Sequence, residues 1–379
     1  MERTIYLDNN ASTRVDERVI QSMLPFLTEN YSNPASPHLL GLKANEAIKA
    51  SRRQISDLIG SSSNELIFTS GATEALNLAI KGIAENSNKK RRHIITVATE
   101  HEAVLNTYKY LENTGFDVSY LSVNSNGEID LQDYKDSIRD ETILVSIMHV
   151  NNEIGTIHPI REYAALAHQV GAIFLSDCTQ SVGKIPVNVN DLGVDLLCFS
   201  GHKIYAPKGI GVLYINKNLR GKLTPLIHGG GQENGLRSGT PNVSSIVALG
   251  TACFLANKTM SSEAIRIKEM RDLLEFELLK LPNTSLNGSR GNRIYNVTNI
   301  CFSGLDANML IGNIKNVAVS NGSACSSSTL EPSHVLKAIG RPDEDAFSSI
   351  RFSLGKYNTR DEIEMAIQSY SKYVLKFHT

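Results

Sequence analysis

Short apolar runs alternate with helical patterns between residues 66 and 215, and this alternation limits the possible folds more than any other feature of the sequence. The helical patterns cover residues 75–84, 103–111 and 163–170. The runs that we predict to be strands are residues 66–69, 94–97, 118–123, 143–150, 173–175, 196–199 and 212–215. Strands that are apolar throughout and separated by helices are typical of a mostly parallel sheet with helices on both faces. We therefore expect a large α/β domain.

The pattern changes after Pro241. A helical stretch over residues 265–281 precedes three shorter predicted strands, at residues 297–302, 317–319 and 350–354. Thr359 and Glu362 form a capping box for a last helix, and its expected apolar face consists of Ile363, Ala366, Ile367, Tyr370, Val374 and Phe377. Single cores stop growing at roughly 250–300 residues. For this chain of 379 residues we therefore expect a large domain over 14–256 and a smaller α+β domain over 1–13 and 257–379.

Composition excludes several classes of protein. The formal net charge of -1 provides no general attraction to nucleic acid or to anionic membranes. We find no apolar run near the ~20 residues that a membrane span needs and no secretory signal at the start of the sequence. Five cysteines without a paired spacing favour neither a disulfide framework nor a zinc site. A reducing cytoplasm is the expected compartment.

Polar residues stand at the ends of several predicted strands, where a parallel sheet presents its ligand site. After Thr69 the chain turns through Gly71 into a helix, whose free N–H groups and the Thr73 hydroxyl suit a phosphate; an ordinary strand–glycine–helix turn explains this motif equally well. Asp177 closes another strand. Its carboxylate can accept a hydrogen bond from a protonated ring nitrogen, or it can simply act as an N-cap for the next segment of the chain.

A third strand ends in Ser200, His202 and Lys203. The hydroxyl and the imidazole can donate to a phosphate, and the amine can form an imine with an aldehyde. A lysine is usually a solvated surface charge, but that interpretation fits poorly at the end of a buried strand.

These motifs resemble those of the fold-type-I pyridoxal-phosphate (PLP) enzymes, and among them the NifS/IscS-like cysteine desulfurases of the class-V aminotransferase family. The resemblance extends over nearly the whole chain. Its segments are YLDNNA at 6–11, SNPASPH at 32–38, GATE at 71–74, TEH at 99–101, HVNNEIG at 149–155, DCTQ at 177–180, SGHK at 200–203, RSGT at 237–240, GSAC at 322–325 and SIRFS at 349–353.

The resemblance implies a role for each matching residue. Lys203 would be the Schiff-base lysine, His101 would stack on the pyridine ring, and Asp177 would keep the ring nitrogen protonated so that the ring withdraws electrons. The other implied cofactor-binding residues are Ala72, Thr73, Ser200 and His202 at the phosphate, and Asn152 and Gln180 at the ring oxygen and the substrate side. His101 would lie just inside a helix start.

Two further implied roles concern the substrate and the assembly. Arg351 would bind the substrate carboxylate in a bidentate pair, although a surface arginine on an edge strand is the alternative. Thr240 is similar to a residue that reaches the phosphate of a neighbouring subunit, which implies a homodimer with shared sites.

Sulfur removal needs a thiolate, and the resemblance assigns it to Cys325. This cysteine would attack the sulfur of the bound L-cysteine, take it as a persulfide and release alanine. Its neighbours are small and polar, which favours a mobile loop, and they resemble the long-loop branch of the family. Cys198, Cys253 and Cys301 have apolar neighbours and are expected to be buried, and Cys178 should point away from the cofactor because it follows Asp177 on a strand.

Other functions stay open at this point. An aminotransferase or a selenocysteine lyase uses the same fold, and a binding platform for a sulfur-transfer partner is a non-catalytic alternative. The acceptor protein could serve iron–sulfur cluster assembly, thiolation, or DNA sulfur modification as in DndA-like proteins. We expect no metal site, although Cys325 could transiently ligate an iron–sulfur cluster, and we expect no direct contact with nucleic acid or membrane.

Overall fold

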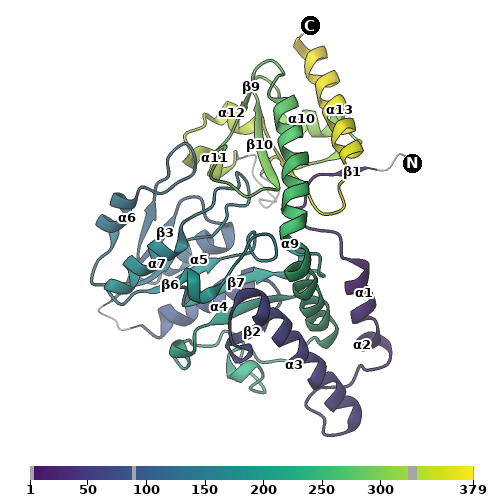
Figure 1. The fold of residues 1–379 in the computed structure, drawn as a ribbon. Helices are drawn as coiled ribbons and strands as arrows, with labels where there is room; N and C mark the ends of the chain where they lie inside the picture. Colours follow the sequence, from purple (N-terminus) through teal and green to yellow (C-terminus); the bar gives the residue numbers. More distant parts are fainter. Residues whose placement is uncertain (1–3, 88–90, 323–330, 379) are drawn as a thin grey trace.

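The computed structural model describes residues 4–87, 91–322 and 331–378, and its largest element is a seven-stranded sheet (Figure 1). The strand order is β2-β8-β7-β6-β5-β3-β4. The bounds are Leu66–Thr69 for β2, His93–Val97 for β3, Asp117–Leu121 for β4, Thr142–Ser146 for β5, Ile173–Asp177 for β6, Leu196–Ser200 for β7 and Gly211–Ile215 for β8. Neighbouring strands from β4 to β7 are parallel, and only β8 runs antiparallel to its neighbours β7 and β2. The predicted mostly parallel sheet is confirmed.

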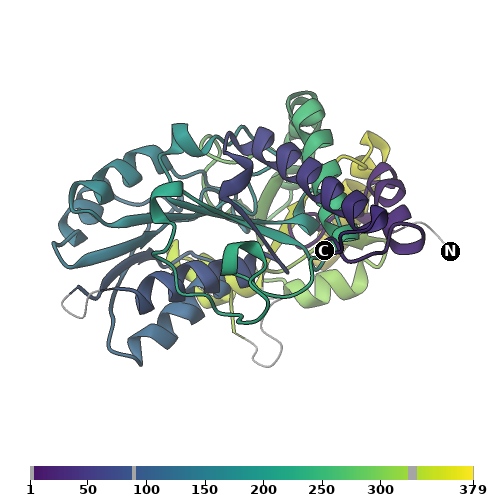
Figure 2. The ribbon, with the colours of Figure 1, turned by 90° about the horizontal axis from the view of Figure 1, so that it is seen from below.

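Helices cover both faces of this sheet, as Figure 2 shows. One buried apolar cluster includes residues of α3 (Leu39–Ile59) and α7 (Ile160–Gln169), and a second includes residues of α4 (Ala72–Glu85) and α5 (Glu102–Glu112). The other helices of this part are α1 (Glu17–Met23), α2 (Pro25–Thr28), α6 (Leu131–Ser137) and α8 (Val189–Leu192). Both faces are buried in every strand except the edge strand β4, where Asp117 and Tyr120 are exposed. The buried strands therefore read as nearly continuous apolar runs.

The prediction of a strand over residues 143–150 is too long, because β5 ends at Ser146. Met148 and Val150 are apolar for a different reason: both line a cavity beyond the strand end. Val150 also pairs with Ile157 in an isolated antiparallel bridge. The chain therefore leaves the sheet here and forms a wall of the site.

A second group of elements contains the three-stranded antiparallel sheet β12-β10-β9 and the parallel pair β1-β11. The strands are Ile5–Tyr6 for β1, Thr284–Leu286 for β9, Val297–Phe302 for β10, Val317–Ala318 for β11 and Ser349–Ser353 for β12, and the helices are α10 (Ala307–Asn313), α11 (His334–Ala338), α12 (Asp343–Phe347) and α13 (Arg360–His378). The pair β1-β11 joins the start of the chain to its C-terminal part. This part has its own apolar core.

Helix α13 begins with the predicted capping box: the Glu362 amide donates to the Thr359 hydroxyl, and the Thr359 amide donates to the Glu362 carboxylate. Most of its predicted apolar face is fully buried, namely Ile363, Ala366, Tyr370 and Val374. The prediction was wrong for Phe377, which is 59% exposed. It stands in the last turn, where the helix extends beyond the core.

Helix α9 (Val243–Leu278) connects the two parts and begins well before the predicted start at residue 265 (Figure 1). Its first half contributes Leu249 and Cys253 to the core of the large part, and its second half contributes Ile267 and Leu274 to the small part. By length and composition alone α9 could cross a membrane, but half of its apolar window is buried inside the protein. It is a core helix, and it implies no membrane.

Tyr370 offers a stability prediction with a matched control. Its hydroxyl is buried without a hydrogen-bond partner among the described residues, whereas the hydroxyl of buried Tyr134 donates to the Tyr163 carbonyl over 2.8 Å. We expect Tyr370→Phe to leave the free energy of unfolding unchanged or to raise it by up to about 1 kcal/mol, and Tyr134→Phe to lower it by about 1 kcal/mol. Denaturant titrations of both variants measure this, and equal losses in the two would contradict it.

Candidate active site

A cavity of about 530 Å³ opens where β2, β6 and β7 reach their carboxyl ends. This edge is the usual place for a ligand in an open α/β sheet. Of the predicted site residues that the structure describes, all except Thr240 line it: Ala72, Thr73, His101, Asn152, Asp177, Gln180, Ser200, His202, Lys203 and Arg351. Segments far apart in the sequence therefore supply one site, as the resemblance implies.

Lys203 ends a short 3-10 helix (Gly201–Lys203) that directly follows β7. Its Nζ donates to the backbone carbonyl of Asn10 over 2.8 Å and to that of Ala11 over 2.6 Å. The amine is thus held at the cavity wall by the N-terminal segment.

The start of α4 provides the expected anion site. No side chain of the described residues caps this helix after Gly71, so the first N–H groups, at Ala72 and Thr73, remain available to an anion. Strand β8 approaches so closely that a Cβ on Gly211 would lie 2.6 Å from the Cα of Gly71. Glycine at position 211 therefore allows the turn to pack against the sheet.

Ser200 and His202 lie on the same side of the cavity. A Cβ built on Gly71 would be 3.6 Å from the Ser200 hydroxyl, which places that hydroxyl beside the helix start. Burial, together with the charges of Lys203 and Lys208, lowers the pKa of His202 to about 4. The ring is therefore neutral at pH 7, and it can bind an anion through one N–H rather than through a positive charge.

Asp177 closes β6 and is almost fully buried. Its Oδ1 accepts from the Thr179 amide over 2.9 Å and from the Cys198 thiol over 3.6 Å. The neighbouring Thr179 also lines the cavity, and its hydroxyl is buried without a partner among the described residues. Asp177 and Thr179 thus border the cavity at this end of the sheet.

His101 is the N-cap of α5 rather than a residue inside the helix, which corrects the expected position by one residue. Its Nδ1 accepts from the Ala103 amide over 3.1 Å, so the ring proton is on Nε2. Burial lowers its pKa, although the Asp177 carboxylate opposes this shift. A neutral, oriented imidazole suits stacking on an aromatic ring.

Arg351 is 5% exposed, which excludes the alternative of a surface arginine. Its Nη2 pairs with the Asp8 carboxylate at 2.8 Å, and its Nη1 donates to the Asn152 carbonyl over 3.2 Å. The Nε is buried without a partner among the described residues. A donor therefore remains unused on a guanidinium that borders the cavity.

One predicted residue is not brought to the cavity, and another lies outside the described residues. Thr240 is exposed and lies outside the residues that line it. Cys325 lies outside the described residues, as does most of its predicted loop. Gly322 does line the cavity, and three residues span at most about 11 Å of chain.

The four other cysteines, Cys178, Cys198, Cys253 and Cys301, are all buried. Burial raises the pKa of Cys301 to about 11 and that of Cys178 to about 12, and it raises the pKa values of the other two as well. Thiols with such pKa values carry almost no thiolate at pH 7. The sequence-based expectation that these residues are buried is confirmed.

Three buried polar residues border the site without a role assigned from the sequence. Asn10 accepts from Lys203, Lys184 donates to Asn10 and Gln180, and Glu153 accepts from the Ser333 hydroxyl over 2.6 Å. A Cβ on Gly322 would lie 2.6 Å from the same Glu153 oxygen. Gly322 and Ser333, which precede and follow Cys325 in the sequence, therefore both lie beside the buried Glu153 carboxylate. The motif segments contain Asn10 and Glu153, but their contacts are long-range.

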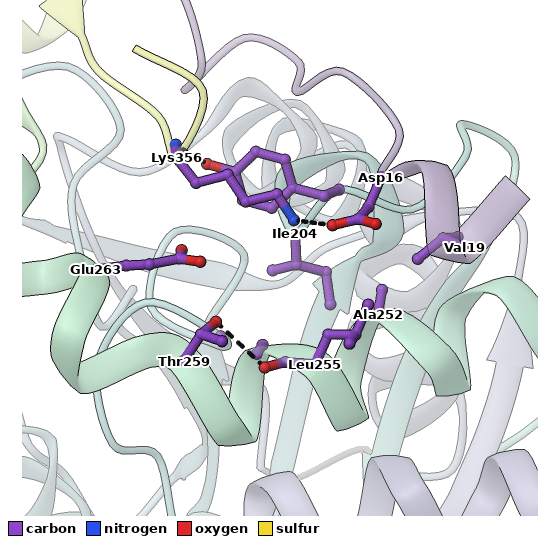
Figure 3. A pocket seen from close by; sticks show the side chains of 11 residues that line it. Asp16, Val19, Ile204, Ala252, Leu255, Thr259, Glu263 and Lys356 are labelled. Carbon is purple, nitrogen blue, oxygen red and sulfur yellow. Dashed lines mark hydrogen bonds and ion pairs between the residues drawn. The ribbon is translucent and has the colours of Figure 1, made fainter. Parts of the chain in front are cut away.

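A second, much smaller cavity of about 10 Å³ lies beside α9 (Figure 3). Lys356 pairs there with Asp16 at 2.5 Å, and Glu263 of α9 points toward the same space. This cavity is too small for a cofactor. The ion pair joins the segment before α1 to the turn after β12.

Comparison with known proteins agrees with this geometry. The family model described as Aminotransferase class-V matches residues 5–365. Cysteine desulfurase IscS of Serratia proteamaculans (strain 568) is 48% identical over 377 residues, which are 99% of this chain and 93% of that protein. A solved structure of a NifS-like protein has a TM-score of 0.93 at 37% identity and covers 99% of this chain and 100% of its own. A structure of SspA in complex with cysteine has a TM-score of 0.82 at 38% identity, covering 94% of this chain and 100% of its own. The chain therefore belongs to the class-V aminotransferase family, and its relatives place it among the cysteine desulfurases of that family.

Proposed function

We propose that this chain is a PLP-dependent cysteine desulfurase that converts L-cysteine to L-alanine and keeps the sulfur on Cys325 as a persulfide. The observation that carries the proposal is the convergence of Lys203, Asp177 and Arg351 on one cavity whose wall, at Gly322, leads directly to Cys325. A lysine, an acid and an arginine suit an amino-acid substrate on PLP. The nearby thiol suits sulfur transfer.

The residues of the cavity fit PLP. The uncapped start of α4, with Ser200 and His202, would hold the phosphate, and the Asp177 carboxylate would accept from the ring nitrogen. Lys203 would attach the cofactor, and His101, which lines the same cavity, would stack on the ring. When bound, the cofactor withdraws electrons from the substrate and so allows its C–S bond to break.

Arg351 would bind the substrate carboxylate. Its Nε is unpartnered among the described residues, and a guanidinium can bind a carboxylate through two parallel N–H donors. The ion pair with Asp8 would fix the plane of the Arg351 guanidinium and would leave some of its N–H donors for the substrate. The substrate would therefore be held by its carboxylate, with its side chain free to meet a thiolate.

Cys325 would collect the sulfur. Its thiolate would attack the substrate sulfur and form an S–S bond while the C–S bond breaks. The bonding electron pair stays with the substrate carbon, which gains a proton and leaves as alanine. The four buried cysteines support this choice because their raised pKa values disfavour a thiolate.

A homodimer and an acceptor protein complete the proposal. Thr240 is exposed and away from its own cavity, as expected of a residue that serves a neighbouring subunit. The sulfur would pass to an acceptor protein in the cytoplasm, for iron–sulfur assembly, thiolation or DNA sulfur modification. The Gly322–Ser333 segment starts at the cavity wall, which favours delivery from this side of the molecule.

The test is to add L-cysteine to purified protein loaded with PLP and to trap and map any persulfide by mass spectrometry. We expect one equivalent of alanine per persulfide on Cys325, and continued sulfide release when a thiol reductant is present. Formation of a keto acid without persulfide would instead indicate an aminotransferase. A protein that acquires no visible PLP absorption would contradict the cofactor assignment itself.

A further inference from the structure

Lys184 is a buried amine in the turn after β6, and the proposed reaction does not use it. Its Nζ donates to Gln180 Oε1 over 2.5 Å and to Asn10 Oδ1 over 3.2 Å. Burial, together with the charges of Lys203 and Arg351, lowers its pKa to about 7. Burying an amine near two other cations costs free energy, so the position of Lys184 needs an explanation.

The contact with Lys184 determines how the side-chain amide of Gln180 is oriented. Lys184 Nζ donates here, so the Gln180 atom that faces the amine is the carbonyl oxygen. The NH2 group then points the other way, where it donates to the Asn10 carbonyl over 3.0 Å. An amide has two N–H donors. The second is available at the cavity, which Gln180 lines.

Lys184 fixes the side chain of Asn10 in the same way. Asn10 Oδ1 accepts from Lys184 and also from Asn296 Nδ2 over 3.0 Å, and the Asn10 Nδ2 donates to the Asn152 carbonyl over 3.1 Å. The backbone carbonyl of Asn10 accepts from Lys203 Nζ. Two hydrogen bonds thus connect the buried amine to the proposed cofactor-binding lysine through one asparagine.

We propose that Lys184 is a positioning residue for the cofactor. By donating to Gln180 Oε1 and Asn10 Oδ1, it turns the Gln180 NH2 toward the ring oxygen of PLP and holds Asn10 against Lys203. This inference rests on the proposed function, because it assumes that PLP occupies the cavity. It assigns Lys184 no contact with the substrate or the cofactor.

The test measures how fast the loaded protein loses its cofactor. We expect Lys184→Met to lose the visible PLP band on dialysis about tenfold faster than the native protein, a factor equivalent to one charge-assisted hydrogen bond. Lys184→Arg, which also only donates, should keep the rate within about threefold. A native rate in Lys184→Met would overturn the proposal.

A double-mutant cycle tests whether Lys184 acts through Gln180. In a Gln180→Ala background, Lys184→Met should change the release rate by only about threefold, because the amide that it orients is gone and only its contact with Asn10 is left to lose. A full tenfold effect in that background would show that Lys184 acts by another route and would overturn the proposal. A merely structural lysine would destabilise both backgrounds equally.

A fallback covers the case in which Lys184→Met does not fold. Lys184→Gln keeps a polar group, but its amide can donate or accept, so it no longer dictates the orientation of Gln180. We expect the same tenfold faster release of PLP from this variant, and a native rate would overturn the proposal.

The proposed function and the inference about Lys184 can be distinguished by how they fail. If the native protein binds no PLP, the proposed function is wrong; if it binds PLP and these variants behave as native, only the inference about Lys184 is wrong.

Discussion

Replacement of Lys203 by alanine is expected to abolish both the visible absorption of the attached cofactor and the release of sulfur from L-cysteine. The Lys203 amine is the only amine of the described residues that both lines the cavity and is held by the Asn10 and Ala11 carbonyls. Without it, the covalent attachment and a proton carrier near the substrate are lost together. We expect turnover to fall by at least about a thousandfold.

The absorption spectrum and the rate of alanine formation measure this effect. Lys222→Ala is a matched control, because Lys222 is an exposed lysine that does not line the cavity, and it should keep the native spectrum and rate. Circular dichroism should show that both variants are folded. Native turnover in Lys203→Ala would refute the assignment of the cofactor site.

Replacement of Cys325 by alanine is expected to separate cofactor binding from sulfur transfer. The variant should keep the visible band, because the residues proposed to hold the cofactor, Lys203, Asp177 and His101, are unchanged and line the cavity. It should form no persulfide, and sulfide release in the presence of a thiol reductant should fall at least about a hundredfold. The reason is chemical: the remaining described thiols are buried and have raised pKa values.

Cys178→Ala is the control, because its thiol lies next to Asp177 in the sequence but donates to Ser176 Oγ over 3.7 Å inside the core. Sulfide release in this variant should stay within about twofold of the native rate. Mass spectrometry after addition of cysteine locates the sulfur in each protein. Undiminished sulfide release by Cys325→Ala would eliminate the proposed persulfide route.

The strand ends of the large part could be predicted because a parallel sheet imposes two local rules. Its strands are apolar on both faces, and its site residues follow their carboxyl ends. Asp177 and Ser200 obey these rules, so their positions alone mark them as site residues. The resemblance then supplies roles that position cannot.

The contacts between distant segments could not be predicted. The pairing of Arg351 with Asp8 joins residues 343 positions apart, and the contacts of Lys184 with Asn10 depend on where the first residues return to the sheet. The early start of α9 escapes prediction because Gly250 and the polar stretch of residues 259–262 weaken its helical pattern. Local periodicity carries no information on such long-range pairing.

Helix α9 has 36 residues, a length of about 54 Å at the ordinary rise of 1.5 Å per residue. One continuous helix supplies side chains to both apolar cores. Unfolding of either part would therefore remove support from the half of α9 that packs in the other part. We therefore expect heat or denaturant to unfold the protein in a single cooperative transition. Substitutions near the C-terminal helix would then lower the amount of active enzyme without touching its chemistry.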